Sequence, residues 1–426
     1  MKSIYGRTSV VLVVTLGMIF GAATNAETDK YRLSLRDSPS HSMVIGWCQD
    51  SGENPTVHYG TEDHGQDVEK YAREAGPDRE VSFKKMEHRF VRLEGLKADT
   101  AYYFVIRDSN SVSPRLWFRT TQERGPIHFL TGGDSRTVPK DRRKANRMVS
   151  RLCADFVAFA GDFTSYGGAD QWAQWLEDWQ LTIADDGRMT PIVAARGNHE
   201  PGNEHLYNIF DLPNKKNYYT IAFGGNFMRL YTLNTHIKVR GEQTREFEKD
   251  LKRHKNVRWK IAQYHAPIRP HTKGKPEGDR MYDAWAELFH KYQVRLAMEC
   301  DSHMCKITWP VRPAGTGEPG ASEGFVRDDA AGTVFVGEGT WGAPRRPAND
   351  PKPWTRGLGS FNQMKWIRVT GQNIKIRTVR YDNVKQVGTV QEDKPWVPPE
   401  NINLWTLPDG VQCVVLPACA PAPVRR

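Results

Sequence analysis

The sequence predicts an α/β domain that follows an all-β sandwich domain. One observation is that residues 127–298 alternate short apolar strands with helical stretches, as expected when parallel strands are joined by crossovers. Another is that residues from about 30 to 121 form short β-branched and aromatic runs separated by turn residues. The 426 residues leave room for two or three domains. With 38% apolar residues and 13 tryptophans, the composition excludes a disordered chain.

The first 26 residues have the organisation of a cleavable secretory signal peptide. Lys2 and Arg7 precede an apolar run over residues 9–20, and small residues follow up to Ala26. The apolar run is short for a membrane helix, and polar residues follow directly, so we expect cleavage after Ala26; an uncleaved membrane anchor is the alternative. We therefore predict a secreted or periplasmic protein with no membrane span in the mature chain.

The charge of the chain suits an acidic partner without identifying it. There are 60 Lys and Arg residues against 50 Asp and Glu residues, which gives a formal charge of +10. The basic clusters at 142–144, 252–255 and 345–346 are separated, and no aromatic-interleaved basic motif accompanies them. We therefore predict no specific nucleic-acid binding, and the sequence leaves the oligomeric state open.

All six cysteines lie after the predicted signal peptide, so disulfides are permitted. The closest local pair is Cys413 with Cys419, which we favour as a bridge, although the sequence allows 15 complete pairings. A cysteine-rich zinc site is not favoured, because the spacing of Cys300 and Cys305 does not match a zinc knuckle.

Residues 27–121 are assigned to the all-β sandwich domain. Its strands are expected at 43–48, 56–59, 88–93, 101–107 and 115–119. The stretch 96–105, which contains Tyr102 and Tyr103, resembles the tyrosine corner of fibronectin type III-like domains.

Residues 127–390 are assigned to the α/β domain, after a polar linker with breaker residues. Its strands are expected at 127–130, 156–160, 191–195, 259–264 and 294–298, and a hairpin over 217–233 turns at 224–226. Its helices are expected at about 140–153, 170–182, 242–254 and 281–292. Residues 391–426 are rich in proline and are predicted to be a tail that packs on the two domains.

Residues that can ligate a metal follow the apolar strands of this domain. They are Asp134, Asp162, Asn198, His265, Asp301 and His303. Because ligands of open α/β sheets gather at the carboxyl ends of the strands, these residues are expected to form one site. Carboxylate, amide and imidazole ligands without thiolate favour Mn, Fe, Zn or Mg. Three carboxylates in one site require neutralising cations, which favours two metal ions over one.

The ordered motifs in this domain resemble those of the calcineurin-like metallophosphoesterases, and the β-sandwich resembles the N-terminal domain of purple acid phosphatases. The motifs are Gly133-Asp134, Gly161-Asp162, Gly197-Asn-His-Glu200, His265-Ala-Pro267 and Asp301-Ser-His303. The resemblance covers roughly residues 30–385. It implies a four-layer α/β fold, a β-sandwich flanked by helices, and two metal ions that are Fe, Mn or Zn.

The resemblance also implies a role for each motif residue. Asp162 would bridge the two ions, Asp134 and His303 would hold the first, and the remaining ligands, Asn198, His265 and Asp301, would hold the second. A metal-bridging hydroxide would attack phosphorus in line, and His199 would orient the phosphate or protonate the leaving oxygen. Glu200 is expected to support the ligands or cap a helix. The implied activity is hydrolysis of small-molecule phosphate monoesters or diesters.

The sequence departs from the purple acid phosphatase pattern at the first metal. Ser165 occupies the position of the metal-bound tyrosine, and Tyr166 comes one residue later. Either a bulge still delivers the Tyr166 phenolate, which we favour, or the first ion lacks a tyrosine ligand. Arg136 stands where many metallophosphoesterases have a metal-binding histidine, and its fork suits either a phosphate or a neighbouring carboxylate.

The second departure is Asp301, which replaces a histidine of the family pattern. Counting three aspartates, one tyrosinate, one trivalent ion, one divalent ion and a hydroxide gives a neutral centre, whereas the histidine version would be positive. We hypothesise that this lowers attraction for monoester dianions and favours diesters or divalent-only metal pairs. The alternative is that Asp301 is an equivalent oxygen ligand without an effect on selectivity.

Two functions from different classes follow from these residues. The first is a secreted dinuclear phosphoesterase. The second is a catalytically weak cell-surface binding or scaffold protein built on the same fold. Retention of a bridging carboxylate together with His199 favours the enzyme, because a scaffold has no chemical need for both.

Overall fold

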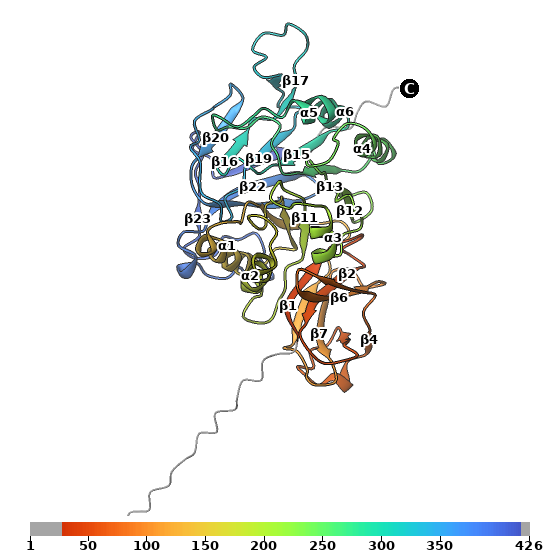
Figure 1. Ribbon diagram of the computed structural model, residues 1–426. Coiled ribbons are helices and arrows are strands. Elements are labelled where there is room, and N and C mark those ends of the chain that lie inside the picture. The colour runs from red at the N-terminus through yellow and green to blue at the C-terminus, as the bar shows by residue number, and fades with distance from the viewer. Residues whose placement is uncertain (1–27, 419–426) are drawn as a thin grey trace, which may run out of the picture.

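The computed structural model describes residues 28–418, so the predicted signal peptide and Cys419 lie outside the described residues. The N-terminal module consists of two antiparallel strand groups at one end of the molecule (Figure 1). The first group follows the order β1-β2-β6-β5 and the second β4-β3-β7-β8. Their bounds are β1 Thr28–Ser34, β2 Met43–Gln49, β3 Thr56–Gly60, β4 Arg73–Ala75, β5 Arg79–Phe83, β6 Met86–Leu93, β7 Ala101–Arg107 and β8 Leu116–Arg119. All five predicted strands are confirmed; β1, β4 and β5 were not predicted.

The first group is continuous with the main sheet of the α/β domain. That sheet has 11 strands, in the order β23-β22-β21-β9-β10-β11-β1-β2-β6-β5, with β24 added to β22. The strands β9 (Ile127–Gly132), β10 (Phe156–Phe159) and β11 (Ile192–Ala194) are parallel. At the junction Ser34 pairs with Ile192, also in parallel. The N-terminal module therefore continues the main sheet beyond β11, and this pairing holds the module against the α/β domain.

A second sheet of seven strands packs on the first. Its order is β12-β13-β14-β15-β19-β16-β20. The bounds are β12 Tyr219–Phe223, β13 Met228–Thr232, β14 Trp259–Gln263, β15 Val294–Met298, β16 Cys305–Thr308, β19 Val334–Gly337 and β20 Thr355–Gly359. The β12–β13 pair is the predicted hairpin. A separate two-stranded ribbon is formed by β17 (Val311–Pro313) and β18 (Phe325–Arg327).

Helices cover the outer faces of the two sheets, which gives four layers (Figure 1). On the first sheet lie α1 (Pro139–Leu152) and α2 (Ala169–Trp179). On the second lie α4 (Glu242–Arg253), α5 (Asp279–Met281), the π-helical turn Tyr282–Ala286 and α6 (Glu287–Lys291). The short helix α3 (Glu204–Phe210) follows the loop that contains residues 197–200, and it was not predicted. The α/β fold class and its four-layer arrangement are confirmed.

The helical periodicity of α2 explains how it covers the first sheet. Trp172, Trp175 and Trp179 follow at spacings of three and four residues, so they lie on one face of the helix, and all are buried. Trp175 and Trp179 meet the ring of Phe159 on β10 at centroid distances of 5.9 and 6.4 Å. This packing anchors the strand that ends at the functional loop.

The C-terminal residues add strands to the main sheet. The segments β23 (Asn403–Leu404) and β24 (Cys413–Pro417) both pair with β22 (Asn373–Arg380), which in turn pairs with β21 (Gln363–Val369). Val414 and Leu416 alternate with exposed residues and are buried, so this short stretch has the period of a half-buried strand. The prolines predicted a tail that packs on the two domains, and part of this segment extends the main sheet as strands.

No helix within residues 28–418 is long and apolar enough to cross a membrane.

Ion pairs of Asp211 link the N-terminal module to the α/β domain. It follows α3, and its carboxylate is fully buried. Arg92 donates two hydrogen bonds to it at 2.8 and 2.9 Å, and Arg79 and Arg36 approach to 3.2 and 3.3 Å. All three arginines belong to the module, so one buried carboxylate collects three cations across the domain boundary.

We expect Asp211→Ala to lower the free energy of unfolding by about 3 kcal/mol, because it leaves partly buried arginines without their counter-charge. Urea denaturation followed by tryptophan fluorescence measures the change. Asp382→Ala is the matched control, because Asp382 forms an exposed pair with Arg380 and should change stability by only about 0.5 kcal/mol. Equal midpoints for the two variants would contradict this role of Asp211.

Candidate dinuclear metal centre

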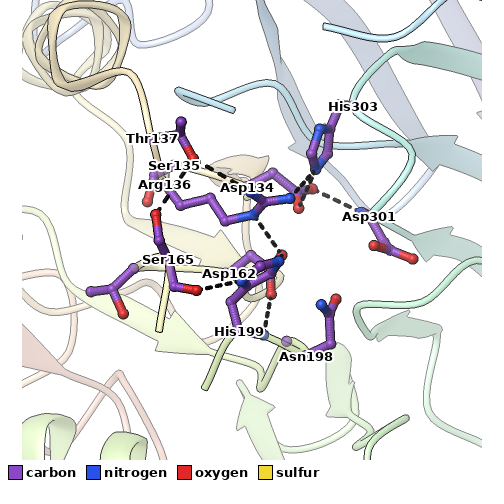
Figure 2. A network of polar contacts seen from close by, with 12 residues as sticks. Asp134, Ser135, Arg136, Thr137, Asp162, Ser165, Asn198, His199, Asp301 and His303 are labelled. Carbon is purple, nitrogen blue, oxygen red and sulfur yellow. Dashed lines mark hydrogen bonds and ion pairs between the residues drawn. The ribbon is translucent and has the colours of Figure 1, made fainter. Parts of the chain in front are cut away.

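Figure 2 shows five of the predicted strand-end ligands, which come from both sheets and lie in one region: Asp134, Asp162, Asn198, Asp301 and His303. Asp134 and Asp162 follow β9 and β10, and Asn198 follows β11. His265 follows β14, while Asp301 and His303 follow β15. The two sheets thus present their carboxyl ends to one region, and ligands separated by up to 169 positions meet there. The convergence expected from the strand-end rule is observed.

Two of the carboxylates are fully buried and one is nearly so. Asp134 and Asp162 have no exposed surface, and the side chain of Asp301 is 17% exposed. The backbone N–H of Asp301 donates to Asp134 Oδ2 at 2.8 Å, which ties the second sheet to the first. Asp134 Oδ1 has no hydrogen-bond partner among the described residues. A buried carboxylate oxygen without a partner is costly unless a cation binds it.

Three histidines of the centre, His199, His265 and His303, present the same ring nitrogen to it. Each Nδ1 donates to a backbone carbonyl: His265 to Ala160, His303 to Pro344 and His199 to Ser165. A carbonyl can only accept, so in each ring Nδ1 carries the proton and Nε2 faces the carboxylates. His265 Nε2 lies 3.3 Å from Asp162 Oδ1, and His303 Nε2 lies 3.4 Å from Asp134 Oδ1.

The electrostatics of the centre are dominated by these charge pairs. Burial alone would lower the pKa of His265, but the carboxylates, Asp162 foremost, outweigh burial and raise that pKa to about 10. In the same way burial would raise the pKa of Asp162, and His265 holds it well below its ordinary value. The His265 imidazole therefore takes up a proton, and its positive charge balances the carboxylates. A metal ion supplies this positive charge instead when His265 serves as a ligand.

Glu200 holds the loops that carry the ligands. Its Oε2 accepts the backbone N–H groups of Asp162 (3.1 Å) and Gly197 (2.8 Å), and its Oε1 accepts that of Phe163 (2.9 Å). Burial and the charge of Asp162 raise the pKa of Glu200 to about 7. Gly197 is required because a Cβ there would lie 2.2 Å from Asp162 Oδ1. The supporting role expected for Glu200 agrees with these contacts.

The ligand residues are held in an unusual backbone conformation. Asp134, Asp162, Asp301 and His303 have φ values of 57°, 59°, 71° and 53°, in the left-handed region that is uncommon for residues other than glycine. Such strain persists where the surrounding structure imposes it, and it clusters at functional sites. At the ends of β9, β10 and β15 the chain thereby turns sharply and presents these side chains to the centre.

The residues fit two metal ions. Asp134, Asp162 and His303 form one group, and Asp162, His265 and Asp301 form another; within each group the ligand atoms lie within 4.8 Å of one another. Asp162 belongs to both groups, as a bridging ligand must. Asn198 adds an oxygen to the second group, because its Oδ1 lies 3.0 Å from His265 Nε2. The donors are carboxylate, imidazole and amide, which suits hard or borderline ions.

Tyr166 does not join these groups. Its side chain is 70% exposed and lies against Gly168, whereas the other first-group ligands are buried. Gly167 turns the chain with a φ of 70°, and the Tyr166 backbone N–H is held by Gln171. A shift of one residue along this loop therefore points the phenol to solvent, and this arrangement does not support the expected phenolate ligand.

Arg136 lies over the first group instead. Its Nε lies 3.3 Å from Asp162 Oδ2, and its Nη2 lies 3.3 Å from His303 Nε2 (Figure 2). The guanidinium is 15% exposed. Of the two roles that the sequence left open, the contact with a carboxylate is the one present, and the phosphate role requires the side chain to move when an ion binds.

Lys275, Arg346 and His236 belong to the centre but were not predicted. Lys275 Nζ lies 2.5 Å from Asp301 Oδ1, and Arg346 donates to the Asp301 carbonyl at 2.7 Å. The ring of His236 lies 5.5 Å from that of His265. His236 follows the end of β13, so the strand-end rule would have found it. Lys275 lies in an irregular loop, and no sequence pattern indicates its target.

Two family models match the chain. Residues 28–120 match the purple acid phosphatase N-terminal domain, and residues 127–300 match the calcineurin-like phosphoesterases. Residues 28–120 are therefore of the purple acid phosphatase N-terminal type and residues 127–300 of the calcineurin-like phosphoesterase type, which supports a phosphoesterase hydrolase. The resemblance stated from the motifs is confirmed.

Solved structures share the fold at low sequence identity. A purple acid phosphatase, PPD1, from yellow lupin (Lupinus luteus) seeds is 16% identical, with a TM-score of 0.69 over 84% of this chain and 72% of the lupin chain. The structure of PhoD is 13% identical, with a TM-score of 0.64 over 84% of this chain and 87% of the PhoD chain. No curated protein matches the chain in sequence. These structures establish the fold of both domains together.

Proposed function

We propose that the protein is an exported, dinuclear metal-dependent phosphoesterase that hydrolyses small-molecule phosphate esters. The observation that carries this proposal is the common arrangement of three imidazoles. Each has Nδ1 fixed on a carbonyl and Nε2 turned toward buried carboxylates. Export is supported by the apolar run over residues 9–20 and the small residues after it.

The two ligand groups define which residues would hold each ion. Asp134 and His303 would hold the first ion, the remaining ligands Asn198, His265 and Asp301 the second, and Asp162 both. When bound, two ions of Fe, Mn or Zn supply Lewis-acid activation of a water nucleophile and of the phosphoryl oxygens. Without Tyr166, the first group offers carboxylate and imidazole ligands alone, so we propose a centre without tyrosinate.

His199 and Arg136 are proposed to act on the substrate. The Nδ1–H of His199 is fixed on Ser165, so the proton that can pass to the leaving oxygen is a second one, carried on Nε2 by the imidazolium form; Nε2 lies 3.8 Å from Asp162 Oδ2. Its side chain is 27% exposed, which leaves it accessible to a substrate. The Arg136 fork can leave the carboxylate and take a pair of phosphoryl oxygens.

The enzyme and the scaffold alternative predict different metal contents. We expect the purified protein to contain transition metal, to lose hydrolysis of p-nitrophenyl phosphate or its bis-ester after chelation, and to regain it with Mn²⁺ or Zn²⁺. Asp162→Asn should remove most of the bound metal, because both groups share this carboxylate. Elemental analysis and the hydrolysis assay measure both effects.

Asp170→Asn is the control for this experiment, since Asp170 is exposed on the first turn of α2. It should keep both metal and activity. A protein with no bound transition metal and no metal-restored hydrolysis of either ester would favour the binding or scaffold function.

The role of His199 predicts a dependence on the leaving group. We expect His199→Ala to lower kcat by about 100-fold for phenyl phosphate and by less for p-nitrophenyl phosphate, whose leaving oxygen needs less protonation. The metal content should stay unchanged. His254→Ala, at the end of α4, is the control. An equal loss on both esters would argue for phosphate positioning without proton transfer.

The preference between monoesters and diesters is proposed to depend on Lys275 as well as Asp301. The net charge of the centre depends on Lys275 and Arg136 as well as on its carboxylates, because both cations lie beside the ligands. Lys275 Nζ lies within ion-pair distance of Asp301, and Arg136 lies beside Asp162. Two cations thus stand against the three carboxylates. We propose that Lys275 offsets the charge of Asp301 and preserves attraction for monoester dianions.

Accordingly, Lys275→Met should lower the ratio of kcat/KM for p-nitrophenyl phosphate to that for bis(p-nitrophenyl) phosphate by about tenfold, as one uncompensated charge nearby predicts. Asp301→His in the Lys275→Met background should restore the ratio. Lys273→Met, an exposed position on the same loop, is the control. An unchanged ratio in Lys275→Met would contradict the proposal that Lys275 offsets the charge of Asp301. If Asp301→His leaves the ratio unchanged both in the wild type and in Lys275→Met, Asp301 is an equivalent ligand without an effect on selectivity.

A further inference from the structure

A large cavity lies at the amino ends of the parallel strands of the main sheet, opposite the metal centre. It has a volume of about 840 Å³. His128 lines it at the start of β9, Asp155 directly before β10 and Pro191 directly before β11. Because these strands are parallel and the metal ligands follow their carboxyl ends, strand rise separates the two sites by roughly 20 Å. We call it the junction cavity.

Three parts of the chain enclose the junction cavity. The N-terminal module contributes Arg119 and neighbouring residues, the catalytic domain contributes the strand starts, and the C-terminal segment contributes residues 392–397. Its volume lies within the range of pockets that hold small organic ligands. The apolar part of the wall includes Met189, Pro191 and Trp396. An occupant would therefore contact all three parts of the chain.

Three nitrogen atoms on the wall of the junction cavity have no hydrogen-bond partner among residues 28–418. They are His128 Nε2, Arg188 Nη2 and Arg368 Nε. His128 is only 4% exposed, and Arg368 is its direct partner in the antiparallel pairing of β21 with β9. Their side chains therefore lie on the same face of the sheet. Leaving such groups unsatisfied costs about 1–3 kcal/mol each. The arginine N–H groups can only donate, and His128 Nε2 donates in the tautomer that carries its proton there, so the wall is suited to an acceptor group.

Four cationic and four acidic side chains line the junction cavity, but they are unevenly paired. Lys394 lies 3.9 Å from Asp393. Arg119 is already paired with Asp99 (3.2 Å) and Glu392 (2.9 Å). Arg188 and Arg368 form no ion pair in the described part of the chain. The carboxylate that lines the cavity near them, Asp155, accepts the backbone N–H of His128 at 2.7 Å. Burial raises the pKa of Asp155 to about 6, so this group is still mainly ionised at neutral pH and supplies one negative charge against the two arginines.

We propose that the junction cavity binds a small organic oxyanion, a carboxylate or phosphate group carried on an apolar body. Arg188, Arg368 and His128 would hold the oxyanion, and the wall of Met189, Pro191 and Trp396 would contact the apolar body. The charged fork of arginine matches both oxyanions. This site is separate from the metal centre and does not require its chemistry.

Calorimetric titration of the full-length mature chain with benzoate and with phenylphosphonate tests the proposal, and benzyl alcohol is the neutral counterpart. We expect one or both anions to bind and the alcohol to bind at least tenfold more weakly. Arg188→Gln and Arg368→Gln should each weaken binding at least tenfold, while Arg147→Gln, an exposed arginine of α1, should not. Benzoate and phenylphosphonate also separate a carboxylate site from a phosphate site.

The Asp162→Asn variant separates this site from the metal centre. Binding that survives in Asp162→Asn supports the junction cavity, and binding that is lost there but kept in both arginine variants overturns it. Absence of binding of either anion at millimolar concentration also overturns it.

A measurement on the unmutated chain covers the case in which the arginine variants do not fold. With methyl-labelled methionine, the anion should shift the NMR signal of Met189 in the cavity wall and leave that of Met228, in the core between the sheets, unchanged. A bound anion that leaves the Met189 signal in place would contradict the assignment.

Discussion

The mutual repulsion of carboxylates at one sheet edge is the constraint on which the site depends. Asp134, Asp162 and Asp301 approach one another in a buried setting, where each would raise the pKa of the others unless positive charge stands between them. The protein meets this with three kinds of cation. His265 is protonated when no ion is bound, Arg136 and Lys275 form ion pairs, and the two ligand groups are arranged for metal ions.

The backbone around the carboxylates is built to keep them in place despite this repulsion. Ligand residues at the strand ends adopt left-handed φ values, and Glu200 binds three backbone N–H groups of the loops that carry Asp162 and Gly197. The aromatic face of α2 holds β10 from the other side. Strain at the ligands is therefore supported by hydrogen bonds and packing that do not involve the ligands' own side chains.

Because the strands β9, β10 and β11 of the main sheet are parallel, the metal centre and the junction cavity lie at opposite ends of the same strands. Their carboxyl ends carry the ligands, and their amino ends meet the N-terminal module and the C-terminal segment, where the junction cavity lies. The module is not a loosely attached domain, because β1 pairs with β11 and Asp211 binds arginines from it. Both features couple the position of the module to the catalytic sheet.

Local pattern was sufficient to predict the strands between residues 43 and 298 apart from β4 and β5, most of the helices, and the strand-end ligands. The strand β1 and the strands after β15 were not predicted. Apolar strands, helical periodicity and turn residues are local properties, and the rule that carboxyl ends of parallel strands share an edge turns their order into a site. The predicted positions of Asp134, Asp162, His265 and His303 are matched by the ligand groups. The strands β4 and β5 are short, and in the C-terminal segment the prolines outweighed the strand period of Val414 and Leu416.

What the sequence determined by itself is the class of chemistry, through the identity and order of residues after successive strands. Tertiary structure decided which charged side chains face those residues. Lys275 reaches Asp301 from an irregular loop, Arg136 lies over the first ligand group, and a one-residue shift leaves Tyr166 exposed. Such contacts depend on loop paths and side-chain directions in three dimensions, and no local periodicity encodes them.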